Sequence, residues 1–263
     1  MDIEIDFETE LKNLGLKPTN WPLTLEAIKA KLAPAEWEKF SRLHKNFIGY
    51  KSESTLARFY GFVFSHALQL DINGYRYGRL HAILRDLLPE ISPGEAILDV
   101  GAGAGLIAAL IRKLRSPRAL VLQDPCAEVR DELKAQGFTV LPHPAPAPTL
   151  EHASRDTGPF DLILCADSLG EINSDDDGLL AQPDSVGSED LPQHLEERYG
   201  FAQKLKPWKE YLAPRGRVML WEPFAYQNAM EGLAALLRED GWDSRVVSRA
   251  PMRNYLELRL RSL

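Results

Sequence analysis

The chain has 263 residues and a formal net charge of -7, with 44% apolar and 26% charged residues. This length suits one large domain or a domain with an appendage, and the composition is ordinary for a globular protein. The negative charge argues against a broad surface that binds nucleic-acid phosphates.

The cysteines and the hydropathy pattern indicate in which cellular compartment the protein is expected. The two cysteines, Cys126 and Cys165, have no zinc-type spacing. The first residues, from Met1 to Asp6, lack the basic-then-apolar pattern of a signal peptide. No apolar run approaches the roughly 18 residues of a membrane span. We therefore expect a reduced, cytoplasmic protein without a disulfide, a metal site or a membrane segment.

Residues 1–93 carry little strand signal and are expected to form a helical cap. The spacing of apolar residues predicts a helix that begins near Pro22, and three more over 34–43, 52–70 and 74–88. The helix expected over 52–70 is rich in aromatic residues, most of which we interpret as the core of a small bundle.

The stretch from Tyr75 to Arg79 lies just before the first expected strand. From there, Arg76 can pair with a ligand carboxylate, and Tyr75 or Tyr77 can line a substrate pocket. A solvated helix start is the alternative interpretation.

The chain is organised around a glycine loop. An apolar run over 96–100 contains Asp99 and is followed by Gly101, Gly103 and Gly105, after which a helix-like segment begins. This pattern predicts a buried strand, a glycine turn and a helix whose first N–H groups could stabilise a ligand carboxylate or hydroxyl. Dinucleotide sites use the spacing G-x-G-x-x-G instead, and Asp99 would repel a pyrophosphate. The carboxylate suits a ligand that carries an ammonium and a sulfonium.

Asp99-x-Gly101-x-Gly103-x-Gly105 resembles the first motif of class I S-adenosylmethionine (SAM) dependent methyltransferases. The resemblance implies SAM as the cofactor, bound by Asp99 and the three glycines. From its position before the first strand, Arg76 is the candidate to pair with the cofactor's carboxylate.

From residue 94 onward, expected strands alternate with helices. The expected strands cover 96–100, 119–123, 139–141, 160–166 and 217–221, and then, after a helix over 226–240, an antiparallel pair over 244–247 and 255–260. Continuous apolar strands between helices indicate a parallel sheet that is covered on both faces.

This topology again resembles the class I methyltransferase fold. We expect an α/β protein with a Rossmann-like, seven-stranded, mostly parallel sheet, an antiparallel C-terminal strand and an N-terminal helical cap. Residues 94–263 would form the SAM-binding domain, and 1–93 the cap and substrate region.

Two segments of biased composition interrupt the domain. Residues 142–148 are rich in proline and are expected to form an extended loop. Residues 171–197 are acidic and form either a solvated insertion or a lid that closes over the substrate.

Asp124 follows the second expected strand, beside the glycine loop. A carboxylate there can accept both hydroxyls of a ribose, as the corresponding acid does in the resembled family. The alternative is a helix N-cap. The family often has a polar residue after the third strand that meets the adenine, but this chain has Pro142 and His143, which leaves adenine recognition open.

Asp167 and Glu171 follow the fourth strand, where the donor methyl group and the acceptor should meet. They are the candidate catalytic residues, and helix caps are the alternative. Trp221 ends the fifth strand and either contacts the substrate or belongs to the core. The Asp/Asn-Pro-Pro-aromatic motif of base amino-methyltransferases is absent from this position.

The sequence therefore predicts a methyltransferase that transfers a methyl group from SAM to an oxygen or nitrogen of a small molecule or peptide. Alternatives are an RNA methyltransferase, a catalytically silent scaffold of the same fold, and a nicotinamide-dependent oxidoreductase. The net charge disfavours a nucleic-acid partner.

Overall fold

A computed structural model describes residues 6–49, 53–142, 158–166, 193, 196, 201–222, 227–250 and 253–260. His143, Asp167, Glu171, nearly all of the proline-rich stretch and most of the acidic insertion lie outside these ranges, so the predictions for them stay predictions. Among the described residues, no helix is long and apolar enough to cross a membrane.

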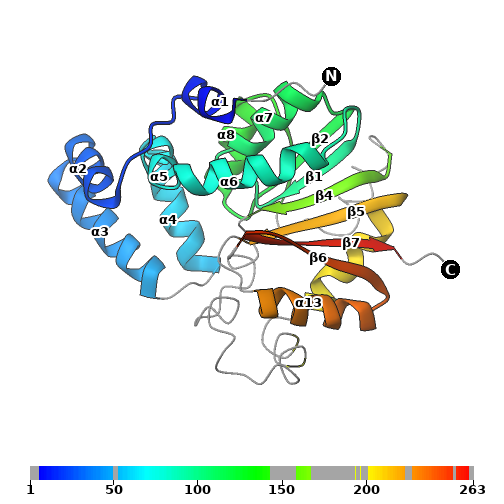
Figure 1. The fold of residues 1–263 in the computed structure, drawn as a ribbon. Coiled ribbons are helices and arrows are strands. Elements are labelled where there is room, and N and C mark those ends of the chain that lie inside the picture. Colours follow the sequence, from blue (N-terminus) through cyan, green and yellow to red (C-terminus); the bar gives the residue numbers. More distant parts are fainter. Residues whose placement is uncertain are drawn as a thin grey trace.

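In the described part of the chain, seven strands form one sheet (Figure 1). In chain order they are β1 (Ala96–Val100), β2 (Ala119–Gln123), β3 (Thr139–Leu141), β4 (Phe160–Ala166), β5 (Leu212–Glu222), β6 (Trp242–Ala250) and β7 (Arg253–Leu260). Their order across the sheet is β3-β2-β1-β4-β5-β7-β6, and β7 runs antiparallel to both of its neighbours while the other pairs are parallel. The predicted Rossmann-like sheet with an antiparallel C-terminal strand is confirmed.

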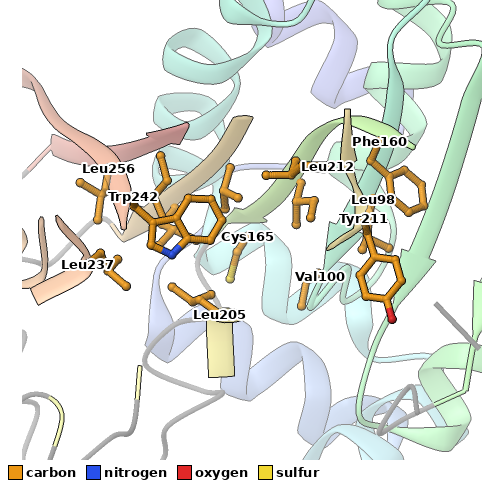
Figure 2. Close-up of a cluster of buried hydrophobic side chains, with 14 of the residues drawn as sticks. Leu98, Val100, Phe160, Cys165, Leu205, Tyr211, Leu212, Leu237, Trp242 and Leu256 are labelled. Carbon is orange, nitrogen blue, oxygen red and sulfur yellow. The ribbon is translucent and has the colours of Figure 1, made fainter. Parts of the chain in front are cut away.

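Both faces of the sheet are buried, which explains the continuous apolar strands. Successive side chains of a strand point to opposite faces. One face packs against α12 (Phe201–Leu205), the 3₁₀ helix η3 (Lys206–Tyr211) and α13 (Gln227–Glu239). Figure 2 shows this cluster, in which Leu98 of β1 and Cys165 of β4 share a core with Trp242 and Leu256.

The other face packs against α6 (Tyr77–Leu87) and α7 (Leu106–Arg115), which lie across the sheet from α13 in Figure 1. Its core includes Ile97 of β1, Leu164 of β4 and Trp221 of β5, and α1 (Phe7–Asn13) adds Leu11. Asp99 lies two residues after Ile97 in β1, so its side chain points to this face as well.

The remaining N-terminal helices form a second core of their own. These are α2 (Trp21–Lys31), α3 (Pro34–Gly49), α4 (Glu53–Ser65) and α5 (Gln69–Tyr75). They gather around Ile28, Phe40, Phe62 and other apolar side chains, and Figure 1 shows α2 and α3 beside the sheet rather than over one of its faces. We call α2–α5 the cap bundle. It contacts the sheet region where α4 packs on α8 (Ala127–Ala135).

The single helix predicted over 52–70 is wrong, because the chain turns after Ser65. Ala67 has φ 52°, its N–H donates to the Phe64 carbonyl oxygen, and the Leu68 N–H donates to the Val63 carbonyl oxygen. These two bonds form a Schellman motif, which usually has glycine at the left-handed position. Alanine there gave no signal in the sequence, and burial of Leu68 holds the turn in place.

The helix predicted over 74–88 also differs from the structure. α5 ends at Tyr75, α6 begins at Tyr77, and Arg76 stands between them with φ -85° and ψ 9°. A short 3₁₀ helix, η1 (Leu88–Glu90), completes the segment. The cap bundle and the sheet core are therefore joined at Arg76.

Two helical glycines allow a matched test of how the cap bundle is held. A Cβ at Gly74 would lie 2.7 Å from the Lys17 carbonyl oxygen, whereas a Cβ at Gly78 would meet no atom within 4 Å. We expect Gly74→Ala to lower the free energy of unfolding by about 1–3 kcal/mol, because backbone must move to admit the methyl group. Gly78→Ala should be neutral or stabilise by up to about 1 kcal/mol. Urea unfolding followed by circular dichroism measures both, and equal effects would contradict the assigned contact.

Candidate functional site

A cavity lies between the cap bundle and the carboxyl edge of the parallel strands. It encloses about 990 Å³ of space between protein atoms, part of it open to solvent. The sheet region contributes Gly101–Ala104, the start of α7, Asp124–Cys126 and Ala166 at the end of β4. The cap side consists of residues from α4, α5 and α6 together with Arg76. Ligands of open α/β sheets bind at this edge.

The glycine loop follows β1 as predicted. Gly101, Gly103 and Gly105 have φ of 76°, 53° and 72°, a region in which other residues are strained. A Cβ at Gly105 would lie 2.6 Å from Leu133 Cδ2, so this glycine also lets α8 pack against the loop. A Cβ at Gly103 would meet nothing within 4 Å, so the loop leaves open space there.

Most of the loop's N–H groups are bonded within the protein. Gly101 and Ala102 donate to the Gln123 carbonyl oxygen at 2.8 and 3.1 Å, and Gly105 donates to that of Ala102 at 3.0 Å. The Gly103 N–H donates to Asp124 Oδ2 at 2.9 Å. These bonds fix the shape of the loop, and they leave fewer donors for a ligand than the sequence suggested.

Asp124 joins the two loops that follow β1 and β2. Besides the bond from Gly103, its Oδ1 accepts the Cys126 N–H at 2.9 Å. The helix α8 begins at Ala127 with Cys126 at the N-cap position, so Asp124 stands two residues before that cap. The buried carboxylate lines the cavity, and carboxylate oxygens can accept more than one hydrogen bond each.

Asp99 is the second acid of the site and is almost fully buried, with 3% of its surface exposed. Burial, together with the negative charge of Asp124, raises the pKa of Asp99 to about 7. Its Oδ2 has no hydrogen-bond partner among the described residues. An unpartnered buried carboxylate oxygen is an acceptor that a cationic or N–H ligand group would satisfy.

Three polar residues reach the cavity from the cap side: Gln69, Asn73 and Arg76. Only Arg76 was predicted. The other two belong to α5. Gln69 lies four residues before Asn73, and Asn73 lies three before Arg76, a spacing that places all three on one helical face once the helix boundaries are known. The aromatic side chains of Tyr60 and Phe64, from α4, also line the cavity and were assigned to the bundle core from the sequence.

The structure does not bring the predicted substrate residues to the cavity lining. Tyr75 is 50% exposed and its ring packs on Trp21, with centroids 5.1 Å apart. The Tyr77 hydroxyl donates to the Glu8 carbonyl oxygen at 3.4 Å. Trp221 is fully buried in the core that α6 and α7 cover. Tyr75, at the end of α5, therefore packs against α2, and Tyr77, at the start of α6, contacts α1, while alternation along β5 turns Trp221 into the core.

No group of three histidine, cysteine or acidic side chains suited to a metal ion occurs among the described residues. The cavity lining combines the glycine loop, the carboxylate of Asp124, the guanidinium of Arg76, two side-chain amides and apolar walls.

Comparison with known proteins identifies the fold. No family model and no curated protein matches the sequence. The solved DhpI–SAH complex matches with a TM-score of 0.50 at 16% identity, over 76% of this chain and 94% of that one.

Two further matches are a methyltransferase from Pyrococcus furiosus and the magnesium protoporphyrin IX methyltransferase of Synechocystis PCC 6803 with bound SAM. Their TM-scores are 0.41 and 0.39 at 15% and 14% identity. The matches cover 68% and 73% of this chain, respectively, and 82% of each of the two matched chains. The strand order and the match to the DhpI–SAH complex show that this protein has the class I SAM-dependent methyltransferase fold.

The raised pKa of Asp99 makes stability depend on pH. Because the folded-state pKa of about 7 lies above the ordinary value of 3.8, the folded protein binds the extra proton between these pH values. The stabilising contribution of protonated Asp99 to the free energy of unfolding is therefore fully present below about pH 4, and it is lost as the pH rises through 7.

We expect the stability of wild type relative to Asp99→Asn to fall by a few kcal/mol between pH 5 and pH 8, at about 1.4 kcal/mol per pKa unit. Urea unfolding of both proteins at four pH values measures this difference. Asp131→Asn, on the exposed part of α8, is the control. A difference that does not change with pH would show that Asp99 titrates normally.

Proposed function

We propose that the protein is a methyltransferase that binds SAM in this cavity and transfers its methyl group to an oxygen or nitrogen of a small molecule or peptide. The observation that carries the proposal is an open glycine loop at the edge where this fold binds ligands, with the buried Asp99 directly before it and Asp124 bonded to it in the cavity lining.

The residues of the site fit SAM by charge and by hydrogen bonding. Asp124 faces the cavity with two oxygens fixed by backbone N–H groups, which suits the two hydroxyls of a ribose. The unpartnered Oδ2 of Asp99 suits the ammonium of the amino-acid end, and Arg76 suits its carboxylate. When bound, SAM supplies a methyl group on a positively charged sulfur.

The chain's own part in such a transfer is to hold donor and acceptor in line and to exclude water. The apolar wall from α4 and α6, including Leu56, Leu80 and Ile83, serves the second purpose. Asp167 and Glu171 follow Ala166, the last residue of β4, which lines the cavity, and we retain them as the candidates that receive the acceptor's proton.

The alternative of an RNA acceptor finds little support in the lining of this cavity. Arg76 is its one lysine or arginine among the described residues, and a polyanionic acceptor would favour several. A filter-binding assay with RNA tests this alternative directly.

Calorimetric titration with SAM and with SAH tests the proposal. We expect both to bind, and we expect Asp124→Asn to weaken binding about 10- to 100-fold, because a hydrogen bond to a charged group contributes about 1.5–3 kcal/mol. Asp131→Asn is the matched control, since it makes the same change outside the cavity. Absence of both heat and a thermal shift with wild type would remove the proposal.

Binding without catalysis is a separate outcome. Incubation with labelled SAM and fractionated cell extract should yield a labelled product if the protein is an enzyme. Tight binding of SAM with no transfer to any fraction would favour the silent scaffold.

A further inference from the structure

Three consecutive carbonyl oxygens after β2 accept hydrogen bonds from other parts of the protein. That of Gln123 accepts two N–H groups of the glycine loop. Those of Asp124 and Pro125 both accept from Nη1 of Arg130, at 2.9 and 2.7 Å. The two hydrogens of one guanidinium nitrogen can therefore bind two neighbouring carbonyl groups, and the contact holds the backbone of Asp124 from the side of α8.

Arg130 occupies a helix position that does not favour a cation for its own sake. It is the fourth residue of α8, which begins at Ala127. The N-terminal end of a helix is the positive end of its dipole, which favours an acidic side chain such as Glu128 and disfavours a basic one. The two hydrogen bonds to the preceding loop supply a reason for an arginine at this place.

These bonds leave the carboxylate of Asp124 available to a ligand. Cys126, the N-cap of α8, makes no side-chain capping hydrogen bond, and Pro125 has no N–H group. Without Arg130, the loop would depend more on the carboxylate itself, which accepts from Gly103 and Cys126. Because Arg130 binds main-chain oxygens, it uses none of the acceptor capacity that a ligand hydroxyl would need.

Arg130 is not among the described residues that line the cavity, whereas Asp124 and Pro125 are. We propose that Arg130 is a positioning residue, which acts from outside the cavity and holds the carboxylate of Asp124 in the orientation that binds the two ribose hydroxyls. The ligand in this inference rests on the proposed function, but the loop contact can be tested without a ligand. Small displacements of a binding group are costly, so such a contact can control affinity.

Amide hydrogen exchange in the ligand-free protein tests the loop contact. Arg130→Met keeps the stem of the side chain and removes its donors, whereas Arg130→Lys keeps a cationic donor. We expect Arg130→Met to speed exchange of the Gly103 and Cys126 N–H groups about fivefold, and Arg130→Lys to restore part of the protection. Exchange at buried Leu164 of β4 reports global unfolding and should stay unchanged. Lys134→Met is the matched control, because it removes a positive charge from an exposed position of the same helix.

A double-mutant cycle with SAH tests whether Arg130 acts through Asp124. In the wild-type background, we expect Arg130→Met to weaken SAH about tenfold in calorimetric titrations. In the Asp124→Asn background, the same change should cost less than about threefold, because the charge and one acceptor oxygen that Arg130 positions are already lost. A general loosening of the protein would instead weaken SAH by the same factor in both backgrounds.

Equal losses in the two backgrounds would overturn the inference and leave the proposed function intact. Exchange at Gly103 and Cys126 that is no faster than in Lys134→Met would do the same. If wild type does not bind SAH, the proposed function fails, and the exchange rates alone decide whether Arg130 holds Asp124. Faster exchange in Arg130→Met would then support the contact, and unchanged exchange would remove it as well.

Discussion

The site depends on the hydrogen bonds of one carboxylate. Asp124 accepts the N–H of Gly103 from the loop after β1 and the N–H of Cys126 from the loop after β2. These loops leave the sheet side by side because Val100 pairs with Gln123 in the parallel register. Burial makes the ionisation of Asp99 harder, and the negative charge of Asp124 adds to this effect. A cationic ligand would relieve this repulsion.

The cavity exists because two separate cores meet along its length. The cap bundle packs around Phe40 and Phe62, while α6 belongs to the core of the sheet, and the chain passes from one to the other at Arg76. A second connection comes from α4. Gly61 has no Cβ, and one placed there would lie 3.0–3.1 Å from the carboxylate of Glu128 on α8. The cap is thus held at two places, and the cavity between them keeps its shape.

Much of this arrangement could be predicted from the sequence. Unbroken apolar strands implied a sheet that is covered on both faces, and three glycines after Asp99 implied the loop, because both signals are local. The turn at Ala67 escaped prediction because the residue in the left-handed position is not glycine, and because the packing of Leu68 that supports the turn is not a local sequence signal. Gln69 was missed for a related reason. Its orientation toward the cavity depends on where α5 begins, which the turn at Ala67 decides.

The internal bonding of the glycine loop distinguishes it from a dinucleotide site. A dinucleotide site presents free N–H groups of the loop and the helix start to a pyrophosphate. Here the N–H groups of Gly101, Ala102, Gly103 and Gly105 already donate to protein oxygens. The acidic group that lines this side of the cavity is the carboxylate of Asp124, which repels a phosphate. Strand and loop therefore share a shape with dinucleotide sites, while the charge that they present favours a positively charged nucleoside.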